Sequence, residues 1–156
     1  MLYKSLVRPH LEYGNLIWRP FNIKDIKLVE SVQRRATKLV PNLKDLSYPQ
    51  RLQKLNIPSL VYRRRIGDMT FMYKLMTGKI NLKPEDIVMF NGHTRGHEFK
   101  VMKKKALRKA RTNVFSNRIV NEWNNLPSNV IKSATTSSFK SNLDKHCVNQ
   151  RFDYVD

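Results

Sequence analysis

Apolar side chains recur every three or four residues along most of the chain, which is the spacing of one face of an α-helix. The clearest example predicts a helix from Asp25 to Val40, with Asp25 in its first turn and Pro41 just after its end. Its apolar positions are Ile26, Val29, Val32, Ala36 and Leu39. Another face of the same helix carries cations, which are Lys27, Arg34, Arg35 and Lys38.

Shorter apolar stripes predict further helices, separated by proline and glycine. They cover residues 1–7, 9–18, 48–55, 59–77 and 112–125, with another helix start at 83–86 and a last helix that Ser137 or Ser138 caps. Ser47 and Ser59 are the expected N-caps of two of them. Gly78 is placed to end one. The tail, residues 150–156, is expected to be unfolded or foreign to the domain.

The segment 91–111 breaks the helical pattern, because Gly92 and Gly96 interrupt it and its apolar residues are scattered. We interpret it as a loop with a small β-hairpin around residues 94–108. The predicted fold class is therefore mainly α, a bundle of five to seven helices with this hairpin.

Five aromatic residues fall on the apolar stripes, and we expect them to pack in the core. Base stacking would instead require exposed rings. The five are Trp18, Tyr62, Tyr73, Phe115 and Trp123.

The composition is that of an ordinary globular chain of about one domain: 156 residues, 40% hydrophobic and 27% charged. No apolar run approaches the roughly 18 residues of a membrane span, so no membrane-spanning segment, and no membrane partner of that kind, is expected. The start of the chain has no signal-peptide pattern. Cys147 is the single cysteine, which excludes an internal disulfide and predicts a reducing, intracellular location, nuclear or cytoplasmic.

The net charge of +18 is the first positive indication of a function. A compact domain with this charge repels itself unless a polyanion neutralises it. Nucleic acid is the obvious partner, because clustered cations release the counterions of its phosphates. An anionic membrane surface or a ribosome-like assembly would satisfy the same charge balance.

Catalytic and metal-binding chemistry is hard to place in this sequence. The only adjacent carboxylates are Glu85 and Asp86, and a helix start explains them. The pairs His93/His97 and His146/Cys147 lack the spacing of a zinc site. We therefore predict no catalytic residues, no metal ligands and no cofactor.

Basic residues concentrate between 95 and 118, where only Glu98 opposes them, and we predict phosphate contact for this region. They are Arg95, Lys100, Lys103, Lys104, Lys105, Arg108, Lys109, Arg111 and Arg118. The cations of the helix 25–40 are a second candidate stripe. A third group is Arg63-Arg64-Arg65, in which Arg64 is expected to pair with Asp68 and to leave Arg63 and Arg65 as the freer cations.

Five strings of this sequence closely resemble the C-terminal part of the reverse transcriptases of non-LTR retrotransposons of the jockey-like kind. They occur in the family's order and span residues 2 to 146. The strings are LYKSLVRPHLEYGNLIW, IKLVESVQRRATKLVPNLKDLSYPQRLQKLNIPSLVYRRRIGDM, TRGHEFKV, FSNRIVNEWNNLP and FKSNLDKH.

This resemblance implies a fragment of an RNA-directed DNA polymerase that is not an enzyme by itself. The metal-binding Tyr/Phe-Ala-Asp-Asp string of the palm is absent from this sequence, so Mg²⁺ would belong to the missing palm. Residues 1–40 resemble the helical thumb and 41–149 the region after it. The implied partners are RNA, DNA or their hybrid, held through phosphates, and the fingers and palm of a full-length protein.

Two alternatives remain open at this point. The chain could be a free-standing basic RNA- or DNA-binding module derived from such an element. It could also be a helical protein-interaction domain whose charge mainly confers solubility.

Overall fold

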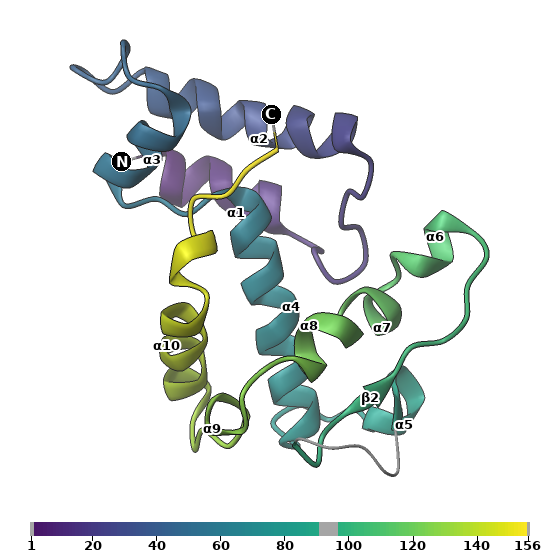
Figure 1. Ribbon diagram of the computed structural model, residues 1–156. Coiled ribbons are helices and arrows are strands. Elements are labelled where there is room, and N and C mark those ends of the chain that lie inside the picture. Colours follow the sequence, from purple (N-terminus) through teal and green to yellow (C-terminus); the bar gives the residue numbers. More distant parts are fainter. Residues whose placement is uncertain (1, 91–96, 156) are drawn as a thin grey trace. The chain divides into compact units, whose positions relative to one another are not determined.

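The computed structural model describes residues 2–90 and 97–155, which divide into two compact units. The first unit contains the described residues up to 65 and those from 147 onward, and the second contains those from 66 to 146. Helix α4 (Leu60–Met76) runs from the first unit into the second (Figure 1). The predicted class is confirmed, because the chain is mainly α-helical with one small hairpin.

The first unit begins with a π-helical turn, η1 (Tyr3–Val7), that continues into α1 (Arg8–Glu12). The predicted helix over 9–18 is too long, because Tyr13 adopts an extended backbone and ends α1. Gly14 follows with a φ of 64°, in the left-handed region that favours glycine. Trp18 is 46% exposed beyond this turn, so its predicted place in the core is wrong.

The next three helices lie close to their predicted positions. They are α2 (Ile23–Lys38), α3 (Tyr48–Leu55) and α4. Ser47 and Gln50 form a reciprocal capping box at the start of α3. The Ser59 hydroxyl accepts the Tyr62 amide at 3.2 Å and caps α4, as predicted.

Helix α2 buries a polar face. Glu30, Gln33 and Thr37 are its buried residues, whereas the predicted apolar positions are half-buried and Leu39 is 80% exposed. A hydrogen-bond chain compensates for this burial. The Tyr3 hydroxyl donates to Gln33 Oε1 at 2.7 Å, and Gln33 Nε2 donates to the Tyr48 hydroxyl at 3.1 Å. Tyr48 in turn donates to Glu30 at 2.5 Å.

Glu30 also accepts the backbone amide of Leu60 at 3.1 Å, so a carboxylate of α2 satisfies an otherwise unpaired donor at the start of α4. Burial raises the pKa of Glu30, and the hydrogen bonds from Tyr48 and Leu60 oppose that rise. The prediction of a helix here was therefore correct, but the prediction of which of its faces is buried was wrong.

The C-terminal residues belong to the first unit. After η2 (Val148–Gln150), Phe152 and Tyr154 pack against a cluster of Tyr48, Leu52 and Ile57. The rings of Tyr48 and Tyr154 meet edge to face, with their centroids 5.3 Å apart. The prediction of an unfolded tail is wrong for the described residues, because its aromatic side chains complete this cluster.

In the second unit, Gly78 ends α4 with a φ of 64°, as predicted, and the Lys79 amide closes the helix end on the Lys74 carbonyl at 2.9 Å. α5 (Pro84–Ile87) follows at the expected start. The hairpin pairs β1 (Met89–Phe90) with β2 (Val101–Met102) in antiparallel fashion. Its first strand precedes the predicted range of 94–108.

The predicted helix over 112–125 is divided into α7 (Phe115–Arg118) and α8 (Val120–Asn124). α6 (Lys109–Thr112) precedes them and ends at the residue where the predicted helix was expected to begin. An extended backbone at Val114 separates α6 from α7. α9 (Ser128–Ile131) was not predicted. α10 (Thr136–His146) starts two or three residues earlier than predicted, because Thr135 caps it by accepting the Ser138 amide at 3.0 Å.

The core of the second unit is apolar and aromatic. Trp123, Tyr73 and Phe139 are each 0% exposed, and the last two rings stack at 4.3 Å. Phe115 meets Phe71 edge to face at 5.2 Å. The predicted core roles of Tyr62, Tyr73, Phe115 and Trp123 are therefore confirmed.

Among the described residues, no helix combines the length and apolar character that crossing a membrane requires.

Candidate nucleic-acid interface

Helix α8 holds the segment that leads into the basic loop. The Trp123 indole donates from Nε1 to the Phe99 carbonyl at 2.7 Å. One residue on, the Asn124 amide accepts the Val101 N–H at 3.0 Å and donates to the Val101 carbonyl at 2.8 Å. The amide thus pairs with both backbone groups of one residue, as a neighbouring strand would.

The basic loop itself is closed by one side chain. Asn117 is 3% exposed, and its Oδ1 accepts the Lys104 N–H at 3.0 Å. Its Nδ2 donates to the Arg111 carbonyl at 3.0 Å. One buried amide therefore ties the two ends of the segment 104–111 together. These two hydrogen bonds hold the loop backbone in place, so its cations project from an ordered loop.

Six of the predicted phosphate-binding residues are exposed on this stretch, which runs from β2 to α6 and its end (Figure 1). They are Lys103, Lys104, Lys105, Arg108, Lys109 and Arg111. No carboxylate occurs between residues 99 and 121 of the sequence. Lys100 is half-buried beside them, and Arg95 lies outside the described residues.

Arg118 does not belong to this exposed set. Its guanidinium makes a two-pronged ion pair with Asp68, with Nε–Oδ2 and Nη2–Oδ1 distances of 2.9 Å. The side chains of Arg118 and Asp68 are 9% and 1% exposed. Asp68 was predicted to pair with Arg64, and the tertiary fold replaces that local pair. Such a buried pair organises the unit's interior.

The predicted cations of α2 are all exposed, but two of them contact other parts of the first unit. The Arg34 guanidinium lies 5.1 Å from the ring centroid of Tyr48 and 5.5 Å from that of Tyr154. Arg35 lines an apolar groove. Lys27 and Lys38 are exposed as well, so the four cations of the stripe have different surroundings and the stripe is chemically less uniform than its sequence suggests.

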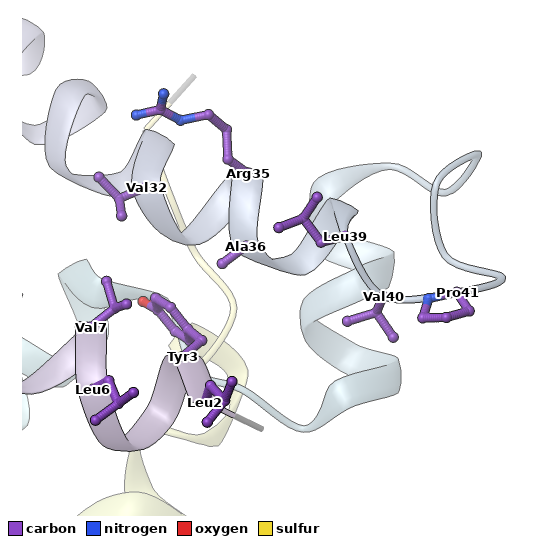
Figure 2. A pocket seen from close by; sticks show the side chains of 10 residues that line it. All are labelled: Leu2, Tyr3, Leu6, Val7, Val32, Arg35, Ala36, Leu39, Val40 and Pro41. Carbon is purple, nitrogen blue, oxygen red and sulfur yellow. The ribbon is translucent and has the colours of Figure 1, made fainter.

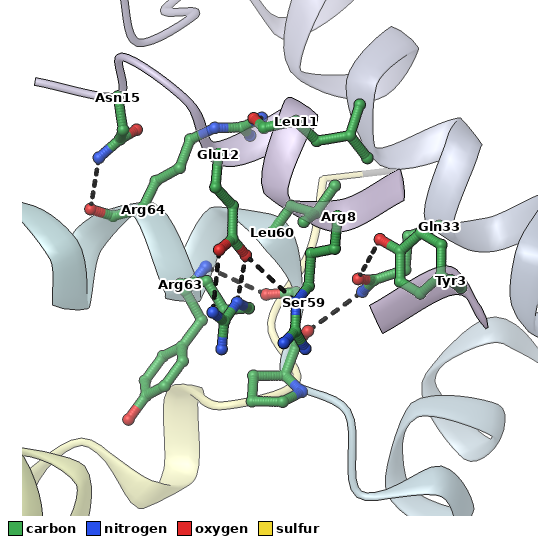
Figure 3. A network of polar contacts seen from close by, with 12 residues as sticks. Tyr3, Arg8, Leu11, Glu12, Asn15, Gln33, Ser59, Leu60, Arg63 and Arg64 are labelled. Atoms are coloured by element: carbon green, nitrogen blue, oxygen red, sulfur yellow. Dashed lines mark hydrogen bonds and ion pairs between the residues drawn. The ribbon is translucent and has the colours of Figure 1, made fainter. Parts of the chain in front are cut away.

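Arg63 and Arg65 are not the freer cations that the sequence predicts. Arg63 binds both carboxylate oxygens of Glu12, and this bond raises the pKa of Arg63 (Figure 3). Arg65 donates to the side chain of Gln150. Arg64 is buried, donates to the Leu11 carbonyl at 3.0 Å, and its burial lowers its pKa. The three consecutive arginines therefore serve mainly to hold the first unit together.

His97, which precedes β2 in the chain, is 5% exposed, with Nε2 3.3 Å from the Trp123 carbonyl. Burial lowers its pKa. In the parts of the chain that the structure describes, no three His, Cys, Asp or Glu side chains gather closely enough to hold a metal ion.

Sequence reasoning missed Asn117 and Asn124, and the apolar pattern gives no signal for them. The two residues are seven apart, or about two helical turns, so they share one face of the predicted helix 112–125. At about 100° per residue, that face lies nearly opposite the apolar stripe of Phe115, Ile119 and Trp123, so a continuous helix would expose both side chains. In the structure, Asn117 lies in α7 and Asn124 in α8, and both pair with the backbone of the neighbouring segment.

No protein-family model matches the chain, and no match is found among the curated proteins or the solved structures.

Proposed function

We propose that this chain is the C-terminal, nucleic-acid-binding part of a retrotransposon RNA-directed DNA polymerase, a reverse transcriptase, and that it grips duplex or hybrid nucleic acid through phosphates. The observation that carries the proposal is the set of six exposed cations on the segment 103–111, in which Asn117 ties the backbone of Lys104 to that of Arg111. Phosphate contacts suit a polymerase because they do not depend on base sequence.

The geometry of the loop supports phosphate binding over a merely solvated charged face. A loop that is already fastened loses less conformational freedom on binding than a flexible basic tail does. The resemblance of the five sequence strings supplies the polymerase context. Lys27 and Lys38 of α2 form a second candidate contact, and the fingers and palm of a longer protein remain proposed partners.

The salt dependence of binding tests the proposal. If roughly five to eight phosphates are engaged, log K should fall against log salt with a slope of about −4 to −7. We expect little sequence preference, and RNA, DNA and hybrid duplexes should be compared. Replacing Lys103, Lys104, Lys105, Arg108 and Lys109 with Gln should flatten the slope by several units, since each contact contributes about one.

A matched control removes the same number of exposed cations elsewhere, all of them lysines. These are Lys54, Lys83, Lys132, Lys140 and Lys145, each replaced with Gln. The control lowers the net charge equally but should leave most of the slope in place. Equal slopes for the two variants would show that only net charge matters and would overturn the assignment of the loop. A strong preference for one base sequence would also contradict it.

A companion variant, with Arg34, Arg35 and Lys38 replaced by Gln, asks whether α2 contributes separately to nucleic-acid binding.

The chain alone should incorporate no nucleotide on a primed template with Mg²⁺, since the resemblance assigns the metal-binding carboxylates to the palm. Template-dependent extension by a pure preparation would contradict this expectation.

A further inference from the structure

An apolar groove of about 540 Å³ opens on the first unit, between η1 and α2 (Figure 2). From η1 it is lined by Tyr3, Leu6 and Val7, with Leu2 just before them. From α2 and the residues after it, the lining is Val32, Arg35, Ala36, Leu39, Val40 and Pro41. Among the described residues that line the groove, Arg35 alone is charged.

The groove leaves large apolar side chains in water. Leu39 is 80% exposed, Leu2 76% and Leu6 61%. A contiguous apolar surface of this kind on a soluble domain marks an interaction site, whereas single exposed leucines are ordinary. The groove is also preformed, because the hydrogen bond from Tyr3 to Gln33 joins its two walls at 2.7 Å.

We propose that this groove binds an amphipathic helix of a partner protein, whose apolar residues enter the groove and whose flanks carry carboxylates. Val32 and Ala36 on α2 and Leu39, the residue that follows its end, lie three or four residues apart and present a strip about 10 Å long, which matches two turns of a helix. The strip therefore suits apolar anchors spaced by three, four and seven residues.

Charge complementarity selects the flanks of that helix. Arg35 lines the groove, and exposed Lys38 and Lys4 lie on the two helices that form its walls. Acidic side chains beside the anchors would pair with these cations, whereas basic ones would be repelled. The same repulsion disfavours a second copy of a chain that carries a net charge of +18.

A labelled peptide and the full chain test this proposal by fluorescence anisotropy. The probe is a 16-residue helix with leucines at positions i, i+3, i+4 and i+7 and glutamates on both flanks. Two further peptides serve as controls: one keeps the composition but scrambles the leucine spacing, and one replaces the glutamates with lysines. We expect each control peptide to bind at least roughly tenfold more weakly than the probe.

Variants of the chain locate the site. Leu39→Gln and Leu6→Gln should each weaken binding of the probe about tenfold, the effect of one lost leucine contact. Both residues are exposed, so folding should survive the changes. Ile17→Gln is the matched control, because Ile17 is 91% exposed in the same unit and does not line the groove. Arg35→Glu should reverse the preference towards the lysine-flanked peptide.

Several outcomes would overturn the proposal. Equal binding of the scrambled peptide would show that charge alone attracts the probe. Equal affinity of Leu39→Gln and Ile17→Gln would place the peptide elsewhere. Self-association of the chain that Leu39→Gln abolishes in sedimentation would make a second copy the occupant. If the unaltered chain binds vesicles of anionic lipid and Leu39→Gln does not, the occupant of the groove would be a membrane surface.

Discussion

Helix α2 of the first unit and helices α7–α8 of the second carry similar apolar stripes but use them in opposite ways. In α7–α8, Phe115, Ile119 and Trp123 are buried, with at most 7% exposure. In α2, the buried residues are Glu30, Gln33 and Thr37, and the apolar stripe forms part of an open groove. A helical period therefore establishes that two faces exist, and the available partners decide which one is buried.

The polar partners explain why α2 can bury its polar face. Tyr3, Tyr48 and the start of α4 supply hydrogen bonds to Gln33 and Glu30. Without them, burying a carboxylate and an amide would cost several kcal/mol. The second unit uses polar contacts differently, because Asn117 and Asn124 hold a loop at the margin of an apolar core.

The largest expected effect tests the apolar core of the second unit. Trp123→Ala should lower the free energy of unfolding by about 3–5 kcal/mol, because it removes a fully buried indole and its bond to the Phe99 carbonyl. Chemical denaturation followed by circular dichroism measures the change. Trp18→Ala is the matched control, and its effect should be well below this range because Trp18 is 46% exposed. Similar losses in both variants would contradict the comparison.

A smaller effect is expected where a buried amide holds the basic loop. Asn117→Ala leaves the Lys104 N–H and the Arg111 carbonyl without this partner, so we expect a loss of about 1–3 kcal/mol. Hydrogen exchange should show faster exchange at the Lys104 amide in the variant. Nucleic-acid affinity should fall while the salt slope stays nearly unchanged, because no cation is removed. Asn125→Ala, at an exposed position, is the control.

An unchanged exchange rate at Lys104 in Asn117→Ala would mean that the amide does not fasten the loop. A slope that flattened as much as in the five-cation variant would mean that loop order and phosphate contact cannot be separated.

Much of the fold could be predicted from local signals. Ser47, Ser59 and Gly78 act at the helix ends where their side chains or backbone freedom are needed, and those signals depend only on neighbouring residues. The burial of Trp123 and Tyr73 also followed from spacing. Local rules failed where a distant residue took over: Asp68 pairs with Arg118, fifty positions away, although Arg64 was the nearer candidate.

The candidate site could be predicted only in part, because local sequence shows its cations but not their contacts with distant residues. The density of cations in the segment 103–111 is visible in the sequence, and their exposure follows from the loop. Glu12 binds Arg63 from 51 positions away, so the loss of that cation to an internal pair could not be predicted from helical spacing. The apolar tail residues Phe152 and Tyr154 likewise found partners that only the fold defines.

The pH dependence of stability sharpens the contrast at Glu30. Burial raises the pKa of Glu30 above its usual value of 4.5, so the carboxyl is protonated more readily in the folded state than in the unfolded state. The stability that this preference adds is present below about pH 4.5 and is lost as the pH rises through the higher pKa of the folded state. Compared with Glu30→Gln, the unaltered chain should thus lose stability as pH rises through this window. Urea titrations from pH 4 to 8 measure the difference, and one that is flat or of opposite sign would show that hydrogen bonding outweighs burial.

The smallest expected effect comes from the exposed face of α2. Leu39→Gln should change the free energy of unfolding by no more than about 0.5 kcal/mol, because an 80% exposed side chain has little contact to lose. Leu143→Gln, at a 0% exposed position of α10, is the contrasting variant, and burying a polar amide in place of a leucine should cost several kcal/mol. Thermal unfolding of the two variants gives the comparison directly. A large loss in Leu39→Gln would mean that the chain already covers this face in solution, so that the polar face of α2 is not the only one it buries.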